Sequence, residues 1–339
     1  MMQQQDQSSS ETDAAGTGVF AFVTLTTNHQ GGGEPSGVVD LAIFRERSTT
    51  LPAWTGSGLK GGLRAATQPE KNANGSAEDA WLDLFGLPGA ETGRMGLVHV
   101  EDGHLVALPV PTPGTAMAWV TSPFLLRRLR QECDEAGIAL ADEGKGGIAI
   151  PDVDFPTCLA ADHLWLAMDG NSQALWLCDL VFERPTPNPA DLDNAEALRC
   201  RWAGVLAQRW YSDSDDAWRS VFERNLVIIP DAAMRHLASM LDVRPRIKIR
   251  SDGEDPGLWF EEVLPDHTLL YARWSVQPVP AAAYFKADKT AEAARWMEGE
   301  DKSPVPGLPS RPKRLFVGGK LTTGHGRVAV SSLSRKAQP

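Results

Sequence analysis

Residues Val19 to Thr26 read VFAFVTLT, and after a glycine-rich loop the chain continues from Gly37 to Arg64 as GVVDLAIFRERSTTLPAWTGSGLKGGLR. The first segment is apolar and rich in β-formers, which predicts a first strand. At the end of the second segment we predict a short helix, Gly56–Ala66, despite its glycines. Between the predicted strand and the predicted helix lies one isolated carboxylate, Asp40, near basic, hydroxyl and glycine residues. Such a composition suits contact with a phosphate backbone.

A second glycine-rich segment lies near the other end of the chain, where Leu315 to Val330 read LFVGGKLTTGHGRVAV. Its glycines expose backbone amides, and a glycine-rich loop alone is weak evidence for a binding site. Two such loops that meet would form a groove suited to a polyanion.

The remaining pattern alternates helices and strands without an internal repeat. Helices are predicted at Ala77–Phe85, from Ser122-Pro123 to about Ala136, at Ala195–Trp210, at Ala217–Glu223 and after a capping Asp231. Hairpins are predicted at Leu97–Val110, turning at Asp102-Gly103, and at Leu164–Leu180, turning at Asp169-Gly170-Asn171. Further strands are predicted at Val227–Ile229, Arg246–Arg250, Thr268–Val276 and Leu315–Val317. This mixture predicts an α+β fold with one antiparallel sheet and inserted helices and hairpins.

Length and composition indicate an ordinary globular protein. The chain has 339 residues, 42% of them hydrophobic and 23% charged, and it contains no apolar run near the ~20 residues of a membrane-spanning helix. Its polar opening is not a signal peptide, so we expect a disordered tail at residues 1–18, one domain over residues 19–335 and a short tail at residues 336–339. The four cysteines are widely spaced, which favours buried, reduced thiols and a cytoplasmic location without membrane contact.

The net charge of −11 taken over the whole chain argues against RNA binding, but the charges are unevenly distributed along the sequence. Residues 301–339 carry eight basic residues and one acid, and residues 41–64 carry four basic residues and one acid. Because a phosphate backbone responds to the local potential, an acidic protein with such basic stretches still suits RNA.

Four segments give the chain a resemblance to a known family: TLTTNHQGGGEPSGVVDLAIFRERSTTLPAWTGSGLKGGLR, GLVHVEDGHLVALPVPTPGTAMAWVTSPFLLRRL, GLWFEEVLPDHTLLY and LFVGGKLTTGHGRVAV. They run from residue 24 to residue 330, and in this order they resemble the RAMP-superfamily backbone subunits of type III-B (Cmr) CRISPR effector complexes, the family of the fourth Cmr subunit. The resemblance implies an RRM-like (ferredoxin-like) core in a single RAMP domain. It also implies copies that stack with other Cmr subunits in a helical filament along a crRNA. Each copy would cut the paired single-stranded target RNA once, at regular intervals.

The same resemblance implies that Asp40, the aspartate of GVVD, is the cutting residue. Attack by a ribose 2′-OH on the adjacent phosphorus can be assisted by a carboxylate as a base or as a ligand for Mg²⁺ or Mn²⁺. His29 is a candidate to orient the 2′-OH or act as an acid, and Glu261 or Glu262 is a candidate second carboxylate. The alternatives are that Asp40 only caps a turn, that His29 is merely solvated, and that the two glutamates only pair with arginines such as Arg273.

Residues expected to hold the RNA backbone fall in both glycine-rich segments. Ser57, Lys60 and Arg64 share one face of the short helix, and Gly56 and Gly58 at its start are expected to leave amides free for phosphate oxygens. The alternative is a tight helix–strand contact that needs small residues. The complete predicted set is Arg45, Ser57, Lys60, Arg64, Gly318, Gly319, Lys320 and Arg327.

Two other functions stay open at this stage. One is a structural crRNA-binding subunit without cleavage activity, and the other is a stand-alone metabolic enzyme whose glycine loops bind a small phosphorylated ligand. The family also has a thumb-like hairpin that wedges between bases, which the sequence does not place. Most of the 11 tryptophans are expected in the core or at subunit contacts, with Trp165 and Trp176 the closest to RNA.

Overall fold

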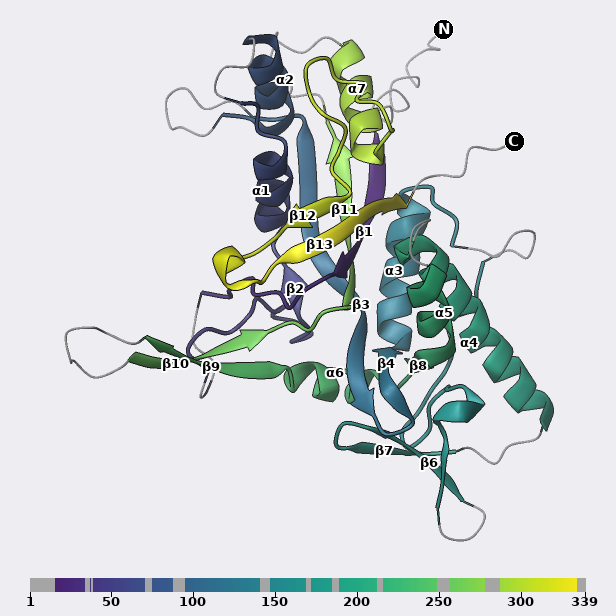
Figure 1. The fold of residues 1–339 in the computed structure, drawn as a ribbon. Helices are drawn as coiled ribbons and strands as arrows, with labels where there is room; N and C mark the ends of the chain where they lie inside the picture. Colours follow the sequence, from purple (N-terminus) through teal and green to yellow (C-terminus); the bar gives the residue numbers. More distant parts are fainter. Residues whose placement is uncertain are drawn as a thin grey trace, which may run out of the picture.

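A computed structural model describes residues 16–33, 37, 39–70, 75–87, 95–140, 147–168, 172–184, 189–211, 216–248, 257–277 and 287–333. The protein is a mixed α+β structure, as predicted (Figure 1). The first strand begins at Thr17, two residues before the predicted start, and residues 1–15 and 336–339 of the predicted tails lie outside the described part. Within the described residues, no helix combines the length and apolar character needed to span a membrane.

One large sheet forms the centre of the molecule. Its strand order is β12-β13-β1-β11-β3-β4-β8, with β2 paired to β3. The strands are β1 (Thr17–Thr24), β2 (Ala53–Trp54), β3 (Val98–Thr112), β4 (Thr115–Thr121), β8 (Leu226–Ile228), β11 (Leu269–Val276), β12 (Arg314–Phe316) and β13 (Arg327–Leu333). The predicted antiparallel sheet is correct except at β4 and β8, which pair in parallel. A parallel pair requires a crossover connection, and residues 122–225, which contain three helices, provide it.

Helices cover both faces of this sheet because β1 alternates its side chains between two cores. Phe20 and Phe22 pack in one core, while Val19, Ala21 and Val23 pack in the other. The first core receives α1 (Gly56–Ala66), α2 (Gly75–Phe85) and α7 (Ala287–Glu298), and the second receives α3 (Pro123–Glu135), α4 (Pro189–Trp210) and α5 (Asp216–Asn225). Figure 1 shows the two groups of helices on opposite sides of β1 and β13.

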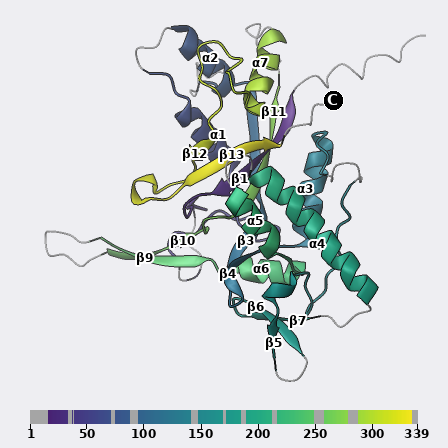
Figure 2. The same ribbon diagram turned by 45° about the vertical axis from the view of Figure 1, so that its right-hand side comes forward.

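Two small sheets extend from the body. Strands β9 (Asp242–Lys248) and β10 (Gly257–Val263) form a hairpin that projects away from the main sheet in both views, beyond α6 (Asp231–Ser239) (Figures 1 and 2). Strands β5 (Leu166–Ala167), β6 (Gln173–Leu177) and β7 (Leu180–Glu183) form the other sheet. The β5–β6 pairing confirms the predicted second hairpin, although its turn lies outside the described residues. Trp165 beside it is a core residue, 7% exposed and bonded to the Ala160 carbonyl, so the expectation that it approaches RNA is wrong.

The predicted hairpin at Asp102-Gly103 is wrong, because β3 runs straight through both residues. A Cβ atom at Gly103 would lie 3.1 Å from the Cβ of Trp54, its partner on the antiparallel strand β2, so this glycine leaves room for the Trp54 side chain. Asp102 accepts a hydrogen bond from the amide of Gly56 at 2.7 Å, which fixes the start of α1. A dipeptide typical of turns therefore serves here as the contact point between β3 and the β2–α1 segment.

Asp231 was predicted to cap the helix that follows it, but it caps a different helix. Asp231 is the first residue of α6, and its carboxylate accepts a hydrogen bond from the amide of Phe124 at 2.9 Å. It therefore caps α3, where Ser122 makes no side-chain cap bond although Pro123 begins the helix as predicted. One helix start supplies the cap of another that lies about a hundred residues earlier.

The four thiols divide into two pairs. Cys133 and Cys158 are buried, and burial raises the pKa of Cys133 to about 12. Cys178 and Cys200 are exposed, so the prediction that all four are buried is wrong for these two. All four are free, as predicted.

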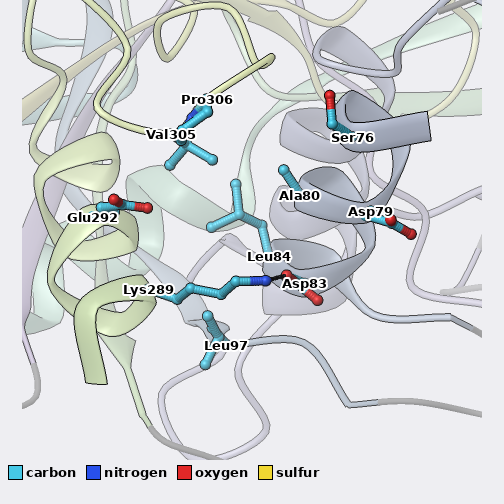
Figure 3. A pocket seen from close by; sticks show the side chains of 10 residues that line it. All are labelled: Ser76, Asp79, Ala80, Asp83, Leu84, Leu97, Lys289, Glu292, Val305 and Pro306. Carbon is cyan, nitrogen blue, oxygen red and sulfur yellow. Dashed lines mark hydrogen bonds and ion pairs between the residues drawn. The ribbon is translucent and has the colours of Figure 1, made fainter. Parts of the chain in front are cut away.

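A cavity of about 290 Å³ separates α2 from α7 (Figure 3). Leu84 and Val305 line its apolar part, and an ion pair between Asp83 and Lys289 joins the two helices beside it. The helices contact each other directly through the rings of Phe85 and Trp296, whose centroids lie 5.9 Å apart, and the ion pair adds a second link between them.

Candidate nucleic-acid interface and cleavage site

The two glycine-rich segments, which were predicted to meet, are joined by a third segment, the residues that follow β1. Gly326 donates its amide hydrogen to the Thr27 carbonyl at 3.0 Å, and Gly319 donates to the His29 carbonyl at 2.8 Å. On its other side, this connecting segment pairs with residues 41–45, where the Phe44 amide bonds the Gln30 carbonyl at 2.7 Å. Residues 25–33 thus bridge the Asp40 segment and the C-terminal glycine loop.

Asp40 lies exposed at the edge of this bridge, next to β10. Its Oδ2 accepts a hydrogen bond from the Phe260 amide at 2.8 Å, and the Leu41 amide bonds the Phe260 carbonyl at 3.0 Å. The carboxylate is therefore fixed by the backbone and still faces solvent.

His29 is buried, contrary to the alternative that it is merely solvated. Its Nδ1 lies 2.8 Å from the Glu262 carbonyl. Because a carbonyl oxygen only accepts, Nδ1 carries the hydrogen of this bond, and Nε2 is the ring nitrogen left for another contact. His29 and Asp40 bond residues two apart on β10, which places their anchor points ~7 Å from one another. The structure therefore brings two of the predicted site residues to one strand.

Glu262 belongs to the same place but is not a free carboxylate. Its Oε1 lies 2.5 Å from Arg45 NH2, and its Oε2 accepts the amide of Ile43 at 3.1 Å. Arg45 also donates to the Ala238 carbonyl at 2.9 Å. The pairing alternative is thus confirmed for Glu262, although Arg273 is the wrong partner because it pairs with a glutamate of α3. Both Glu262 and Arg45 stiffen the segment that carries Asp40.

Glu261 forms a second buried cluster that the sequence analysis did not assemble. Its carboxylate accepts hydrogen bonds from Trp259 Nε1 at 2.7 Å, Lys320 Nζ at 2.9 Å and Arg246 Nε at 3.0 Å. Burial by itself would raise the pKa of Glu261, but the Lys320, Trp259 and Arg246 contacts lower it to about 2. Arg246 also bonds Nε2 of His325 at 2.6 Å. These contacts clamp the β9–β10 hairpin onto the glycine loop.

His325 completes the clamp in its neutral form. Its Nε2 accepts from Arg246, so its Nδ1 carries the hydrogen and donates to Thr27 Oγ1 at 2.9 Å. Burial, reinforced by the Arg246 charge, lowers the pKa of His325. The sequence offered two signals, the basic cluster around Arg246 and the GHGR motif, but nothing in the sequence pairs them.

The amides at the start of α1 are not free, so that prediction is wrong. Gly56 donates to Asp102, and Gly58 donates to the Thr55 hydroxyl at 3.2 Å. A Cβ atom would lie 2.2 Å from the Val100 carbonyl at Gly56 and 1.9 Å from Nε2 of Gln30 at Gly58. The alternative of a tight helix–strand contact is confirmed for Gly56, which packs against β3, whereas Gly58 packs against the Gln30 side chain outside the strands.

The face of α1 that was predicted to bind phosphate does not line the same part of the surface as Asp40. Lys60 donates to the Val98 carbonyl at 2.8 Å, and Arg64 lies 4.5 Å from the ring centre of Trp81. The two cations line a cavity of about 370 Å³, which Asp40 does not line. Burial, followed by the Arg64 charge, lowers the pKa of Lys60. Ser57 is exposed and bonds only the Thr55 hydroxyl.

The C-terminal loop residues mostly have structural contacts. Gly318 has φ +87°, and a Cβ atom there would lie 2.6 Å from the His29 carbonyl, so this position favours glycine. Lys320 is committed to Glu261. Arg327 is exposed, and among the described residues its side chain makes no ion pair.

The donor set at Asp40 fits only a loosely held cation. Within the described ranges, no group of three or more histidine, cysteine or acidic side chains gathers as a metal site. Asp40 offers one free carboxylate oxygen, since the other bonds Phe260. One hard oxygen ligand is compatible with Mg²⁺ or Mn²⁺ that keeps most of its waters.

Comparison with known proteins shows which proteins this chain resembles in sequence and fold. No protein-family model matches the chain. The chain is 27% identical over 265 residues to the CRISPR system Cmr endoribonuclease Cmr4 of Pyrococcus furiosus, which covers 77% of this chain and 81% of that protein. A crystal structure of oligomeric Cmr4 from P. furiosus superposes with a TM-score of 0.61 at 22% identity, covering 95% of this chain and 99% of the other. A chain of the type III-B Cmr-beta complex bound to cognate target RNA gives 0.59 at 17% identity, covering 94% and 97%. The resemblance predicted from the sequence is therefore confirmed.

Proposed function

We propose that this homologue of Cmr4 is a backbone subunit of a type III-B CRISPR effector, which binds crRNA and cleaves complementary target RNA at regular intervals. Copies of the chain would stack in a helical filament with other Cmr subunits. The observation that carries the proposal is the exposed Asp40, held by β10 and set beside His29 at the junction of both glycine-rich segments.

Three properties of the relatives support this proposal. The P. furiosus relative is an endoribonuclease, one superposed structure is oligomeric, and another is bound to cognate target RNA. The predicted RRM-like core belongs to the same proposal. Strand β1 lies between two antiparallel neighbours, β13 and β11, as the first strand does in a ferredoxin-like sheet.

The proposed cleavage is an attack by the ribose 2′-OH on its own 3′-phosphorus. The O2′–P bond forms while the P–O5′ bond breaks, and the leaving O5′ takes up a proton from water, which leaves a 2′,3′-cyclic phosphate and a 5′-hydroxyl. The proton of the 2′-OH passes to a base, for which the Asp40 carboxylate and Nε2 of His29 are the available acceptors. A divalent cation held by Asp40 would neutralise charge on the phosphate.

We assign the β9–β10 hairpin as the thumb-like element of the family. It projects from the body (Figure 2) and exposes large apolar side chains, with Ile247 63% and Leu258 57% exposed. These two side chains belong to residues paired across the hairpin, and exposed apolar side chains on a projecting hairpin suit insertion between bases or contact with a neighbouring copy. The Glu261 cluster fixes the base of this hairpin beside Asp40.

A second candidate function is a structural crRNA-binding subunit without cleavage. One observation favours it: the Asp40 carboxylate already accepts a backbone hydrogen bond, as an acid that only fixes a loop would. A small-molecule enzyme is disfavoured, because Asp40 is exposed on an open surface whereas small ligands are usually enclosed.

The test is cleavage of a labelled, crRNA-complementary RNA by the assembled complex in Mg²⁺, comparing wild type with Asp40→Asn. Asp152→Asn, which changes an exposed carboxylate elsewhere, is the matched control. We expect evenly spaced products from wild type and the control and none from Asp40→Asn, with all three complexes binding RNA equally. Equal cleavage by Asp40→Asn would move the site elsewhere, and RNA binding without cleavage by wild type would support the structural function.

A further inference from the structure

Two rows of side chains share one face of the sheet where it ends in β13 and the edge strand β12 (Figure 1). Residues directly opposite each other on antiparallel strands point to the same face, and so do residues two apart on one strand. The register therefore places both rows on the face that carries Val23. We call these six residues the edge strip: Val23, Ala329 and Arg314 in the first row, and Leu25, Arg327 and Phe316 in the second.

Helices leave most of the edge strip uncovered. On this face α4 reaches β13 at Ser331, whose hydroxyl donates to the Arg209 carbonyl at 3.2 Å, four residues beyond Arg327. The leucines of α1 pack in the core on the opposite face, together with the side chains of β12 and β13 that alternate with the strip. Phe316 is 55% exposed, and both arginines of the strip are exposed. The second row and Arg314 are therefore open to a ligand.

The two arginines of the strip are free to bind an anion. Within the described residues, the side chains of Arg314 and Arg327 make no ion pair and no hydrogen bond, whereas Glu261 neutralises both Arg246 and Lys320 nearby in the fold. Arg314 and Arg327 are diagonal neighbours on paired strands, which sets their Cα atoms ~7–8 Å apart. No residue of the edge strip is acidic. Two such guanidinium groups can contact two successive phosphates of one strand.

Phe316 supplies a flat apolar ring next to both cations. It lies directly opposite Arg327, with Cβ atoms ~4.5–5.5 Å apart, and it shares a face and a strand with Arg314. Proteins bind single-stranded nucleic acid with this combination, because cations follow the backbone while an aromatic ring stacks on a base. An acidic protein partner would also satisfy the arginines, but it would use Phe316 only as apolar area and would not need a planar ring.

We propose that the edge strip binds single-stranded RNA, with successive phosphates on Arg314 and Arg327 and a base stacked on Phe316. The strip begins where the C-terminal glycine loop ends, since Arg327 directly follows that loop, so it extends the junction of the two glycine-rich segments away from Asp40. The inference rests on the proposed function, because it names a further surface for the RNA that such a subunit would hold. Phe316 and Arg314 are the residues that it adds.

The test is titration of the nucleic-acid-free full-length protein with a fluorescein-labelled uridine octanucleotide, followed by fluorescence anisotropy at several salt concentrations. Phe316→Leu keeps an apolar side chain but removes the ring, and we expect it to weaken binding about tenfold without changing the salt dependence. Phe155→Leu, at another exposed phenylalanine, is the matched control and should bind as wild type does.

The arginines are tested through the salt dependence of the same titration. Arg314→Gln should lower the slope of log K against log salt by about 0.7, the value for one phosphate contact on a single strand. Arg235→Gln, which removes an exposed charge on α6, should leave the slope unchanged. Circular dichroism checks that each variant keeps the wild-type fold.

The outcomes separate this inference from the proposed function. RNA binding that neither Phe316→Leu nor Arg314→Gln alters would overturn the edge strip and leave the proposed function standing, whereas no RNA binding by wild type would overturn both. A duplex of the same length should bind more weakly, because its bases cannot stack on Phe316. An acidic Asp-Glu peptide that displaces the RNA and binds Phe316→Leu as tightly as wild type would instead identify a protein-docking surface and overturn the inference.

Discussion

Glu261→Gln tests whether the clamp between the β9–β10 hairpin and the glycine loop stabilises the protein. The carboxylate is 1% exposed and accepts three hydrogen bonds, two of them from the cations Arg246 and Lys320. Glutamine keeps the volume and one acceptor oxygen, but it turns an amide group toward the two cations and removes the negative charge.

The magnitude follows from these contacts. Losing a hydrogen bond to a charged group costs about 1.5–3 kcal/mol, and the stranded cations would add to this if they were buried. The side chains of Arg246 and Lys320 are 32% and 34% exposed, so both can turn to water. We therefore expect a loss of about 2 kcal/mol in the free energy of unfolding. For a chain of 339 residues, an unfolding entropy of about 2.1 cal/mol/K per residue converts this to roughly 3 °C in Tm.

The pH dependence separates a charge effect from a packing effect. The native pKa of Glu261, about 2, lies below its ordinary value of 4.5. The stabilisation is therefore fully present above pH 4.5 and is lost as the pH falls toward 2. The Tm difference between wild type and Glu261→Gln should be constant from pH 6 to 8 and shrink between pH 4.5 and 3.

Thermal unfolding followed by circular dichroism measures both effects. Glu183→Gln, at an exposed position on β7 without an ion pair in the described chain, is the matched control and should leave Tm within 1 °C at every pH. An unchanged Tm for Glu261→Gln would refute the reasoning. A lowered Tm whose difference from wild type stays the same at pH 3 would assign the loss to packing rather than to the charge.

Three further outcomes follow from the contacts described above. Gly62→Ala should destabilise the protein by about 1–3 kcal/mol, because the new Cβ would lie 2.8 Å from a backbone carbonyl of β12, whereas Gly61→Ala, with no atom within 4 Å, should stabilise it by about 0.5–1 kcal/mol; thermal unfolding compares the two, and equal effects would contradict this. His29→Ala should slow target-RNA cleavage about 100-fold with crRNA loading unchanged, and unaltered cleavage would reduce His29 to a packing role. A thiol reagent should titrate two groups, Cys178 and Cys200, in the native protein and four in denaturant, and four fast thiols in the native protein would disagree with the described burial.

Sequence reasoning succeeded where a local signal decides the structure. The bounds of α1 agree with the prediction at both ends, because Thr55 caps the helix and the pattern of buried leucines fixes its face. It failed where a residue with a strong local preference is used by a distant segment. Asp102-Gly103 favours a turn, but the approach of Trp54 and the capping of α1 keep β3 extended. These contacts join residues about 50 positions apart, and no local pattern encodes them.

The candidate site divides in the same way. Asp40, His29 and Glu262 were predicted as site residues, and β10 brings them together. Asp40 and His29 bond the backbone of β10, and Glu262 of β10 bonds the segment that follows Asp40. The role of Glu262 could not be predicted, since it depends on Arg45 reaching it across the fold. Arg246 and His325 were missed as a pair because they lie 79 residues apart and meet only after the hairpin docks on the glycine loop.

The adjacent glutamates explain how basic segments of an acidic chain can lie close together around Asp40. Glu262 neutralises Arg45, and Glu261 neutralises Arg246 and Lys320. Two of these cations, Arg45 and Lys320, were predicted to contact phosphate, and in the structure they fix the segments around Asp40. In the proposed function, such a site would contact a phosphate backbone mainly through the few side chains that stay free, such as Arg327. The proposed cleavage by Asp40 would need this rigidity, because a single carboxylate has no second acid beside it to hold the scissile phosphate in line. The cost of burying these charges near the surface is therefore repaid in the geometry of the site rather than in affinity for RNA.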